Sequence, residues 1–518
     1  MSGAKERSKP REKVARHAGF LATILLLGIF GTSAIISFSP AFENEIERFQ
    51  RAVYNTERTI FTTYFYWYRS TGMLEATQQV INELSPDEVS AISNNLAVPP
   101  ADWPGPTTLD GVISFNATGD GKNYSNQLSH HPPSSEPSYN SSGHVIGELN
   151  RSLPKYENDA NDIIVNISNW LDWMNPGWHE WEMRSMMRAG IDVAMPVYWW
   201  TGPETNFGQW AHDGLIVLND TLTSLRGKVA SEQTLGGDYS PEDVPRISMF
   251  YDTTLMKQLW AHNVSNDNTS AYYGNYLKAF NDGPGADLTN PYWEHQFYLR
   301  IIEFYDVIVN GENLFTVTLN VNGVEEEYCV AWLYGAGWFS KIGPDVFNYC
   351  REHFETRYGK KLLFVGGSDW REAGVDGVCG WGACCNVRTA EYSRIPVGGH
   401  GPGYYNLGAI EVQGASYISR DVNRYKKGFQ EAISSGAAWL HVETWNELLE
   451  GTDICWSQQH GYAFIDATRE IADMFHAMSG FPPAIQGVNF FLVLAPLGIL
   501  GALISLAVVM QRKSRTLG

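Results

Sequence analysis

Apolar and polar positions follow two alternating patterns along the middle of the chain. Residues 178–188 carry apolar side chains at helical spacing, Gly190 follows them, and residues 191–200 form an apolar run. A helix that ends at a glycine and leads into a buried strand is the basic step of an α/β fold. This step recurs, with further helices predicted at 215–225, 255–262, 297–308, 345–358, 425–434 and 462–478, and strands at 62–68, 246–251, 329–334, 362–365 and 437–444.

Helices and strands that alternate in this way predict an α/β architecture with a parallel sheet. No GxGxxG motif follows an early strand and no GxxxxGK[ST] motif occurs, which argues against the nucleotide-binding doubly wound folds. We therefore expect a (β/α)8 TIM barrel with insertions. Residues 97–155, rich in Pro, Gly, Ser, Asn and Asp, predict a long loop insertion, and residues 314–328, centred on Asn322-Gly323, predict an inserted β-hairpin.

Two long apolar runs lie outside this alternating region, at 19–38 and 489–510. Each is long enough to cross a hydrocarbon core of about 30 Å. Residues 1–18 and 511–518 are basic, so the positive-inside rule predicts that both tails are cytoplasmic. The barrel, residues 40–485, is then expected outside the cytoplasm of a cell membrane, with a transmembrane helix at each end. A cleaved signal peptide is the alternative for the first run, and a buried core helix for the second.

The charge balance restricts the partners of this chain. The formal net charge is −20, and the clustered positive charge lies largely in the two basic tails. An acidic barrel repels phosphate backbones, so nucleic acid is not an expected partner. Eight Asn-x-Ser/Thr sequons favour a glycosylated exterior, at Asn116, Asn123, Asn140, Asn150, Asn166, Asn219, Asn263 and Asn268.

All six cysteines lie in the second half of the chain, at Cys329, Cys350, Cys379, Cys384, Cys385 and Cys455. An even number permits disulfides in an oxidising compartment, and the sequence leaves their pairing open. The adjacent Cys384 and Cys385 are expected to bridge to other residues rather than to each other. No CxxC pair has a matching CxxC or HxxxH, so neither a zinc site nor any other metal or cofactor is expected.

Polar and aromatic residues recur at the ends of the predicted strands. They are Tyr66, Tyr68, Tyr198, Trp199, Trp200, Asp252, Tyr334, Asp369, Trp370, Glu447 and Glu450. In a barrel such ends converge on one face, where the chemistry is found. A sugar pocket needs flat apolar faces and a few fixed polar groups, and this chain has 18 tryptophans. Core filling is the alternative for each tryptophan, and Asp252 is either a hydroxyl-binding group or a strand-end cap.

Two carboxylates directly follow the apolar run 437–444. Glu447 and Glu450 are three residues apart, which in a helical turn separates the Cβ atoms by about 5–6 Å. This spacing is compatible with the carboxylates of retaining glycosidases and is short for inverting ones. Two close, partly buried acids also differ in pKa, so one stays protonated and can donate a proton. The pair predicts glycosidase chemistry.

The segment Trp445-Asn446-Glu447-Leu448-Leu449-Glu450-Gly451-Thr452 resembles the signature of glycoside hydrolase family 99, the endo-α-mannosidases, and of related family 71-like barrels. The resemblance covers roughly residues 60 to 475. Other segments are similar in the same order, at 64–68, 130–133, 178–200, 250–252 and 401–406. Leu448-Leu449 stands where Trp-His is usual in that family, which leaves the preference for mannose over glucose open.

The resemblance implies a retaining reaction without a covalent glycosyl-enzyme. Glu447 would take the proton of the sugar 2-hydroxyl, which attacks C1 and gives a 1,2-anhydro sugar. Glu450 would protonate the leaving oxygen and then activate water. Tyr404 or Tyr405 would lie beside the reacting sugar. The substrate-binding residues implied or predicted are Tyr66, Tyr68, His130, His131, Trp199, Trp200, Asp252, Tyr404, Tyr405, Trp445 and Asn446.

We therefore expect a membrane-anchored, exofacial glycoside hydrolase, endo-α-mannosidase-like, that cleaves α-mannosides or α-glucosides with retention. Its expected partners are a glycan and the lipid bilayer. The rival interpretation is a carbohydrate-binding surface protein that keeps the barrel without turnover. A glycan-assembling transferase is a third, weakened because no nucleotide-sugar site is evident in the sequence.

Overall fold

The computed structural model describes residues 58–69, 109–110, 113–114, 132–133, 136–146, 149, 164–165, 172–205, 207–321, 324–391, 393–405, 417–448, 450–457 and 460–478. The apolar runs 19–38 and 489–510, both basic tails and most of the 97–155 loop lie outside these residues. Within the described part of the chain, no helix combines the length and the apolar character that a membrane span needs.

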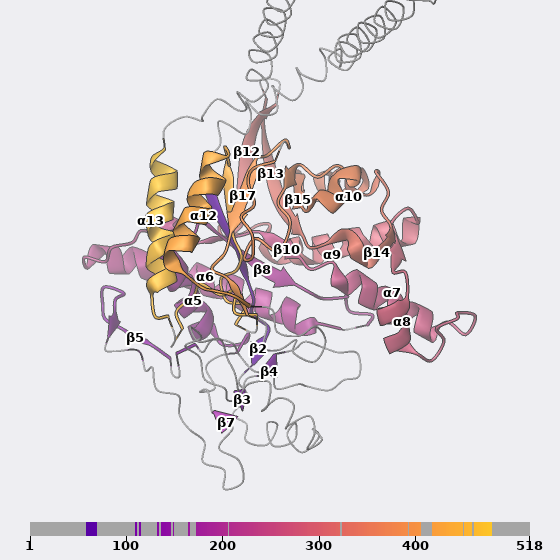
Figure 1. Cartoon of the computed structure of the whole chain (residues 1–518), viewed down its shortest axis with the longest axis horizontal. Coiled ribbons are helices and arrows are strands. Elements are labelled where there is room, and N and C mark those ends of the chain that lie inside the picture. Colours follow the sequence, from indigo (N-terminus) through magenta and orange to yellow (C-terminus); the bar gives the residue numbers. More distant parts are fainter. Residues whose placement is uncertain are drawn as a thin grey trace, which may run out of the picture.

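Eight parallel strands form a nearly closed barrel (Figure 1). Each pairs in parallel with its neighbour, and the last strand in sequence returns to the first. A parallel bridge between Gly377 and Ile395 joins the two edges of this sheet. The strands are β1 (Thr59–Tyr64), β8 (Val193–Tyr198), β10 (Met249–Tyr251), β13 (Val324–Leu333), β15 (Lys361–Gly366), β16 (Gly377–Val378), β17 (Val397–His400) and β20 (Trp439–Val442). The predicted α/β fold with a parallel sheet is confirmed.

Helices surround the barrel, and neighbours in the order α12, α13, α5, α6, α9 and α10 pack against one another (Figure 1). The helices are α5 (Pro176–Ala189), α6 (Gln209–Thr234), α7 (Thr254–Asn266), α8 (Tyr276–Asp282), α9 (Pro291–Ile308), α10 (Val346–Tyr358), α12 (Val422–Ser434) and α13 (Ala463–Ala477), with 3-10 turns η1 (Pro241–Asp243), η2 (Ala336–Trp338) and η3 (Ser368–Ala373). Shorter strands are β2 (Tyr68–Arg69), β3 (Leu109–Asp110), β4 (Ile113–Ser114), β5 (Ser138–Tyr139), β6 (Val145–Ile146), β7 (Ile164–Val165), β9 (Arg246–Ile247), β11 (Ala286–Asp287), β12 (Thr316–Val321), β14 (Phe339–Lys341), β18 (Tyr404–Tyr405) and β19 (Tyr417–Ile418).

The helix α5 illustrates how local sequence determines these elements. Pro176 occupies its first turn, where the missing N–H costs nothing, and the Asn175 side chain accepts a hydrogen bond from Gly177 N at 2.9 Å. Gly190 ends the helix at φ 72°, a left-handed conformation that glycine adopts without strain. The chain then enters β8, so the predicted helix, glycine and strand are confirmed.

Large side chains from several strands fill the barrel. The Phe61 ring of β1 lies 5.1 Å from that of Trp332 and 5.0 Å from that of Trp439. One level further along, His441 contacts Trp332 at 5.1 Å and shares a 2.8 Å hydrogen bond with Thr63. All five side chains are buried. The barrel is therefore a packed core, and its C-terminal rim is where a site can form.

The structure departs from an ideal (β/α)8 barrel after the fifth strand. A 3-10 turn, η3, replaces the helix after β15, and the described residues between β16 and β17 contain no helix. Neither β16 nor β17 was predicted from the sequence, because Gly377, Gly398 and Gly399 are weak strand formers. Close packing explains the glycine at 398, since a Cβ there would lie 3.1 Å from the Cβ atoms of both Ala432 and Ala437.

The predicted hairpin at 314–328 is present, but it is not a separate insertion. β12 and β13 are antiparallel, and Val321 pairs with Val324, while the predicted turn at 322–323 lies outside the described residues. β13 continues beyond the hairpin as the fourth strand of the barrel, and its side chains change from exposed at Val324 to buried at Cys329. One continuous strand therefore serves both the hairpin and the core.

The disulfide prediction is wrong for this structure. All six cysteines lie among the described residues, and all six are free thiols. Cys329, Cys350, Cys379 and Cys455 are buried, where a thiol packs as a small apolar group. The Sγ atoms of the adjacent Cys384 and Cys385 are 3.6 Å apart.

Candidate active site

The segment after β20 is tied to the barrel by its backbone. Trp445 N donates to Thr63 O at 2.9 Å, which attaches the segment to β1. Glu447 N donates to the Thr444 hydroxyl at 3.0 Å, and Thr452 N donates to Glu447 O at 3.3 Å. These bonds fix the turn that carries Glu447 and Glu450 at the C-terminal end of the barrel.

Two residues that the sequence assigned to substrate binding, Trp445 and Asn446, are fully buried under this turn. The Trp445 indole donates to the Glu182 carboxylate at 2.5 Å, and the Asn446 Oδ1 accepts from Phe65 N at 2.7 Å. The Tyr68 hydroxyl donates to Asn446 O at 3.0 Å. These contacts are with the protein itself, and they hold the acid-bearing turn in place.

Glu182, which was not predicted from the sequence, supports the turn from α5. Its carboxylate also accepts from the Trp178 indole at 3.0 Å, and burial raises its pKa from 4.5 to about 7. The folded protein therefore binds a proton between these pH values that the unfolded chain releases, so this group contributes stability at pH 4.5 that is lost as the pH rises to 7.

Glu182→Gln is expected to remove this pH dependence. The unfolding free energy of the unmodified protein should fall relative to that of the variant by roughly 2–3 kcal/mol between about pH 4.5 and about pH 7. Urea unfolding of both proteins across this range measures the difference. The exposed Glu431→Gln is the matched control, and a difference between wild type and Glu182→Gln that stays constant with pH would contradict the assignment.

Glu450 is half-buried at the rim, and burial raises its pKa to about 7, with a further contribution from the charge of Glu443. Glu443 is fully buried directly after β20. Its carboxylate accepts from Gly382 N and Ala383 N, each at 2.9 Å. Burial raises the pKa of Glu443 although these amides oppose the shift. Glu443 is therefore the carboxylate whose charge contributes to the raised pKa of Glu450. The sequence pattern had assigned Glu443 to the strand itself.

Glu447, the other predicted catalytic acid, is 2% exposed. Burial raises the pKa of the Tyr68 phenol, and the charge of Glu447 raises it further. This influence indicates that Glu447 lies near Tyr68. The Tyr68 hydroxyl also accepts from Leu448 N at 2.9 Å. Leu448, which stands where the family 99 signature has an aromatic residue, is buried in the core.

Tyr334, which follows β13, is influenced by carboxyls that follow two other strands, β10 and β20. Burial raises the pKa of Tyr334, followed by the charges of Asp252, Glu450 and Glu443. Asp252 follows β10 and has a pKa raised by burial to about 6. Its Oδ1 accepts from the Thr254 amide at 3.0 Å and hydroxyl at 2.7 Å, which is the predicted strand-end cap. Asp252, Glu443 and Glu450 therefore all influence one phenol at the C-terminal rim, and the predicted convergence of the strand ends on one site stays a prediction.

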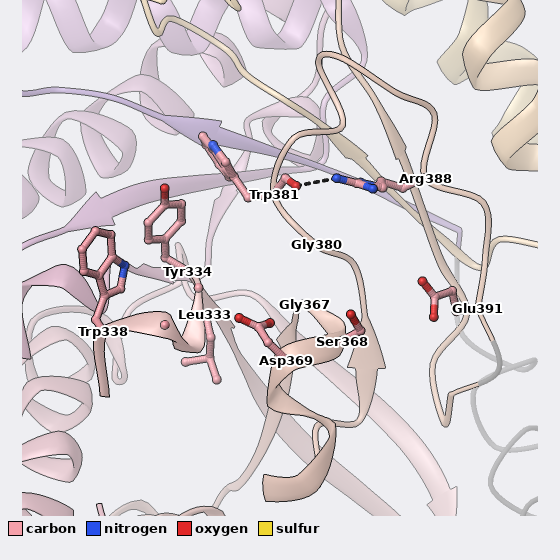
Figure 2. A pocket seen from close by; sticks show the side chains of 12 residues that line it. Leu333, Tyr334, Trp338, Gly367, Ser368, Asp369, Gly380, Trp381, Arg388 and Glu391 are labelled. Carbon is pink, nitrogen blue, oxygen red and sulfur yellow. Dashed lines mark hydrogen bonds between the residues drawn. The ribbon is translucent and has the colours of Figure 1, made fainter. Parts of the chain in front are cut away.

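A cavity of about 480 Å³ is lined in part by Tyr334 (Figure 2). Residues that line it come from the ends of β13, β15 and β16 and include Tyr334, Trp338, Ser368, Asp369, Trp381 and Glu391. The Trp381 ring lies 5.5 Å from that of Tyr334, and the next residue, Gly382, donates to Glu443. Glu447 and Glu450 are not among the residues that line the cavity. Of these six lining residues, Tyr334 and Asp369 were predicted from the sequence and the other four were not.

The remaining predicted substrate-binding residues have varied positions. Tyr66, Trp199 and Trp200 are buried. The Tyr66 hydroxyl donates to Ala211 O at 2.7 Å, the Trp199 indole donates to Thr254 Oγ1 at 2.8 Å, and Trp200 stacks on His212 at 4.3 Å. Tyr404 is half-buried, and its charge contributes to the raised pKa of Tyr334. His130, His131 and the Tyr405 side chain lie outside the described residues.

No cluster of three or more His, Cys, Asp or Glu side chains suited to a metal ion occurs among the residues that the structure describes. The groups present at the rim are carboxyls and phenols. They can supply proton donation by a carboxyl with a pKa near neutrality, and proton acceptance by its neighbours.

Three solved structures illustrate what the chain is similar to. The GH99 endo-α-mannosidase from Bacteroides thetaiotaomicron has a TM-score of 0.36 and 13% identity, covering 62% of this chain and 89% of that one. A glycoside hydrolase-like protein has a TM-score of 0.40 and 14% identity, covering 58% and 86%. GH5_18 from Streptomyces cattleya has a TM-score of 0.35 and 11% identity, covering 60% and 78%. Scores this low decide neither the family nor the activity, and the family 99 resemblance stays a prediction.

A search among curated proteins gives no match. A family model does match, over residues 167–475, which is more than half of the chain and includes every barrel strand except β1. Its description is "Domain of unknown function (DUF5010)". The chain therefore belongs to the DUF5010 family.

Proposed function

We propose that this protein is a glycoside hydrolase that cleaves α-linked glycans. The observation that carries the proposal is the half-buried Glu450, whose pKa of about 7 is set by burial and by the neighbouring Glu443. A carboxyl that stays protonated near neutral pH beside a second carboxylate is the equipment for protonating a glycosidic oxygen. The cavity at Tyr334, with its aromatic lining, supports a sugar as the ligand.

The reaction we propose is hydrolysis with retention through a 1,2-anhydro sugar, as the sequence resemblance implies. Glu447 takes the proton of the 2-hydroxyl while O2 attacks C1, and the leaving oxygen takes the proton of Glu450. Water then attacks C1 and gives its proton to Glu450, and O2 recovers its proton from Glu447. Both carboxyls end in their starting states, so the cycle is balanced. The route requires a free 2-hydroxyl trans to the leaving oxygen, so that O2 attacks C1 from the opposite face, as in an α-mannoside. In an α-glucoside these two oxygens are cis, so cleavage of an α-glucoside would need another route.

Hydrolysis of α-linked mannose and glucose oligosaccharides by the full-length chain tests the proposal. Release of sugar by the wild type and its loss in Glu450→Gln would support it. Binding of the sugars by both proteins without turnover would favour the non-catalytic carbohydrate-binding interpretation instead.

Glu443 has a distinct role in this proposal, because the charge of its carboxylate is the second cause, after burial, of the raised pKa of Glu450. Removing that charge by Glu443→Gln is expected to lower the pKa of Glu450. The alkaline limb of the kcat/KM profile, near pH 7 in the wild type, should therefore move to lower pH by about one unit. The exposed Glu352→Gln is the matched control. A limb that stays in place, or moves upward, would exclude this role.

We also propose that the apolar runs 19–38 and 489–510 anchor the protein in a cell membrane, with residues 40–485 on the outer side and both termini in the cytoplasm. The basic residues 1–18 and 511–518 support this orientation. Cleavage of the 40–485 region by a protease added to intact cells tests the placement, and complete protection would contradict it.

A further inference from the structure

The cavity lined by Tyr334 and Trp381 has a size and position suited to a ligand. Its volume of about 480 Å³ falls within the range of small-molecule sites. It lies at the ends of β13, β15 and β16, where η3 and a long loop follow strands that a regular barrel would connect through helices. Figure 2 shows Trp338, Tyr334 and Trp381 on one side of the cavity, and Asp369 and Ser368 next to them.

The aromatic lining presents fixed faces. Trp381 is half-buried, and its ring lies 5.4 Å from that of Phe250 and 5.5 Å from that of Tyr334. Its backbone oxygen accepts from the Arg388 guanidinium at 2.7 Å, which holds this part of the loop. Trp338 is exposed enough to present its ring to the cavity that it lines. Such faces bind the C–H surface of a sugar ring, and they lose little side-chain entropy on binding because they are already held.

Polar groups at the cavity match sugar hydroxyls. Asp369 is exposed, and its Oδ2 accepts from Ala336 N at 2.6 Å, which fixes the carboxylate in position. Ser368, which also lines the cavity, adds a hydroxyl. Glu391 is paired with Arg371. The lining carries two carboxylates, Asp369 and Glu391, and one guanidinium, that of Arg388, which donates to Trp381 O. The fixed Asp369 carboxylate accepts hydrogen bonds from a neutral polyol, so we take a neutral sugar as the ligand.

Glycines leave this space open. A Cβ atom at Gly337 would meet no atom within 4 Å, and one at Gly380 would meet only Gly367 Cα at 3.7 Å. Both positions line the cavity. Side chains there would therefore fit without displacing the protein, and the room they would occupy is available to a ligand.

Two residues that line the cavity are linked to the carboxylates. Tyr334 lines it and carries the electrostatic influence of Glu443 and Glu450, while Trp381 lines it and precedes the Gly382 amide that holds Glu443. We propose that this cavity is a second sugar-binding subsite, which holds a neutral hexose unit of the glycan whose scissile bond lies at Glu450. The preferred substrate is then an oligosaccharide rather than a single glycosyl unit. This inference rests on the proposed hydrolase function.

Binding and turnover, measured separately, test the subsite. The probes are α-1,2-, α-1,3- and α-1,6-linked mannotetraose and maltotetraose for the cavity, and α-mannosyl and α-glucosyl fluoride for the acids alone. Calorimetry with the full-length Glu450→Gln chain gives Kd without turnover. Trp338→Ala removes an aromatic face, and Gly380→Val fills the cavity. The matched controls are Tyr273→Ala, at an exposed tyrosine, and Gly227→Val, at a glycine where an added Cβ would meet no atom within 4 Å.

Both cavity variants are expected to raise the Kd of at least one tetrasaccharide about 10-fold and to leave kcat/KM for the fluorides within about twofold. If the cavity variants weaken tetrasaccharide binding in this way but the wild type hydrolyses none of the substrates, the subsite is supported and the proposed hydrolase function is contradicted. Hydrolysis that both cavity variants leave unchanged would keep the function and overturn the subsite. Absence of binding by all four tetrasaccharides would also overturn it.

Discussion

Glu450→Gln is expected to lower kcat for an α-linked oligosaccharide by about 10²–10⁴-fold. The amide has nearly the shape of the carboxyl but has no proton to give to the leaving oxygen. Glu450 is half-buried and has a pKa of about 7, so in the wild type it is protonated at and below neutral pH. The kcat/KM of the wild type should accordingly fall as the pH rises above about 7.

The leaving group makes this prediction specific to a proton donor. Fluoride departs without protonation, so for an α-glycosyl fluoride Glu450→Gln loses only the second role of Glu450, which is to accept the proton of the attacking water. The loss should therefore be smaller for the fluoride than for the oligosaccharide. Glu352→Gln, at an exposed glutamate of α10, should retain the wild-type rate. Equal losses on the fluoride and the oligosaccharide would contradict the role of Glu450 as acid.

Glu447→Gln is expected to lower kcat by a similar factor of about 10²–10⁴, but on both substrates alike. The reason is that Glu447 acts on the 2-hydroxyl, which must attack C1 whatever group departs. Glu447 is 2% exposed, so the substitution replaces a buried carboxylate with an amide. The unfolding midpoint of the variant should be measured to check that it folds. Steady-state rates on the fluoride and the oligosaccharide measure the effect.

A substrate without the 2-hydroxyl provides the control for Glu447. A 2-deoxyglycosyl fluoride is chemically more labile than its parent, yet it lacks the oxygen that this mechanism uses as nucleophile. The wild type should leave it uncleaved. Cleavage of the 2-deoxy compound, or a Glu447→Gln variant with full activity on the fluoride, would show that the reaction follows another route.

The sequence predicted the fold where strands have a strong apolar signal. The strands β8 and β20 lie within the apolar runs 191–200 and 437–444. The helix α5 shows the predicted helical spacing and ends at Gly190. β16 and β17 escaped prediction because they are short and contain glycines, whose presence reflects close packing in three dimensions. The described residues between these two strands contain no helix, so this segment has no hydrophobic periodicity from which its structure could be predicted.

The candidate site was predictable in part. Glu450 and Tyr334 stand at strand ends, where polar residues in a buried run suggest a site. Glu443 was overlooked because it directly continues an apolar strand, and its importance depends on the amides of Gly382 and Ala383, 61 and 60 residues earlier in the chain. Trp445 belongs to the most recognisable motif, yet its indole contacts Glu182, a partner that no local pattern reveals.

The closure of the barrel has a consequence for the site. Between β16 and the chain before β17, the described pairing consists of the bridge from Gly377 to Ile395, with fewer rungs than at the other strand boundaries. The connection across this seam is the loop that supplies Gly382 and Ala383 to Glu443. The segment that spans the thinnest joint of the ring is therefore also the one whose amides hold Glu443, the carboxylate whose charge contributes to the raised pKa of Glu450.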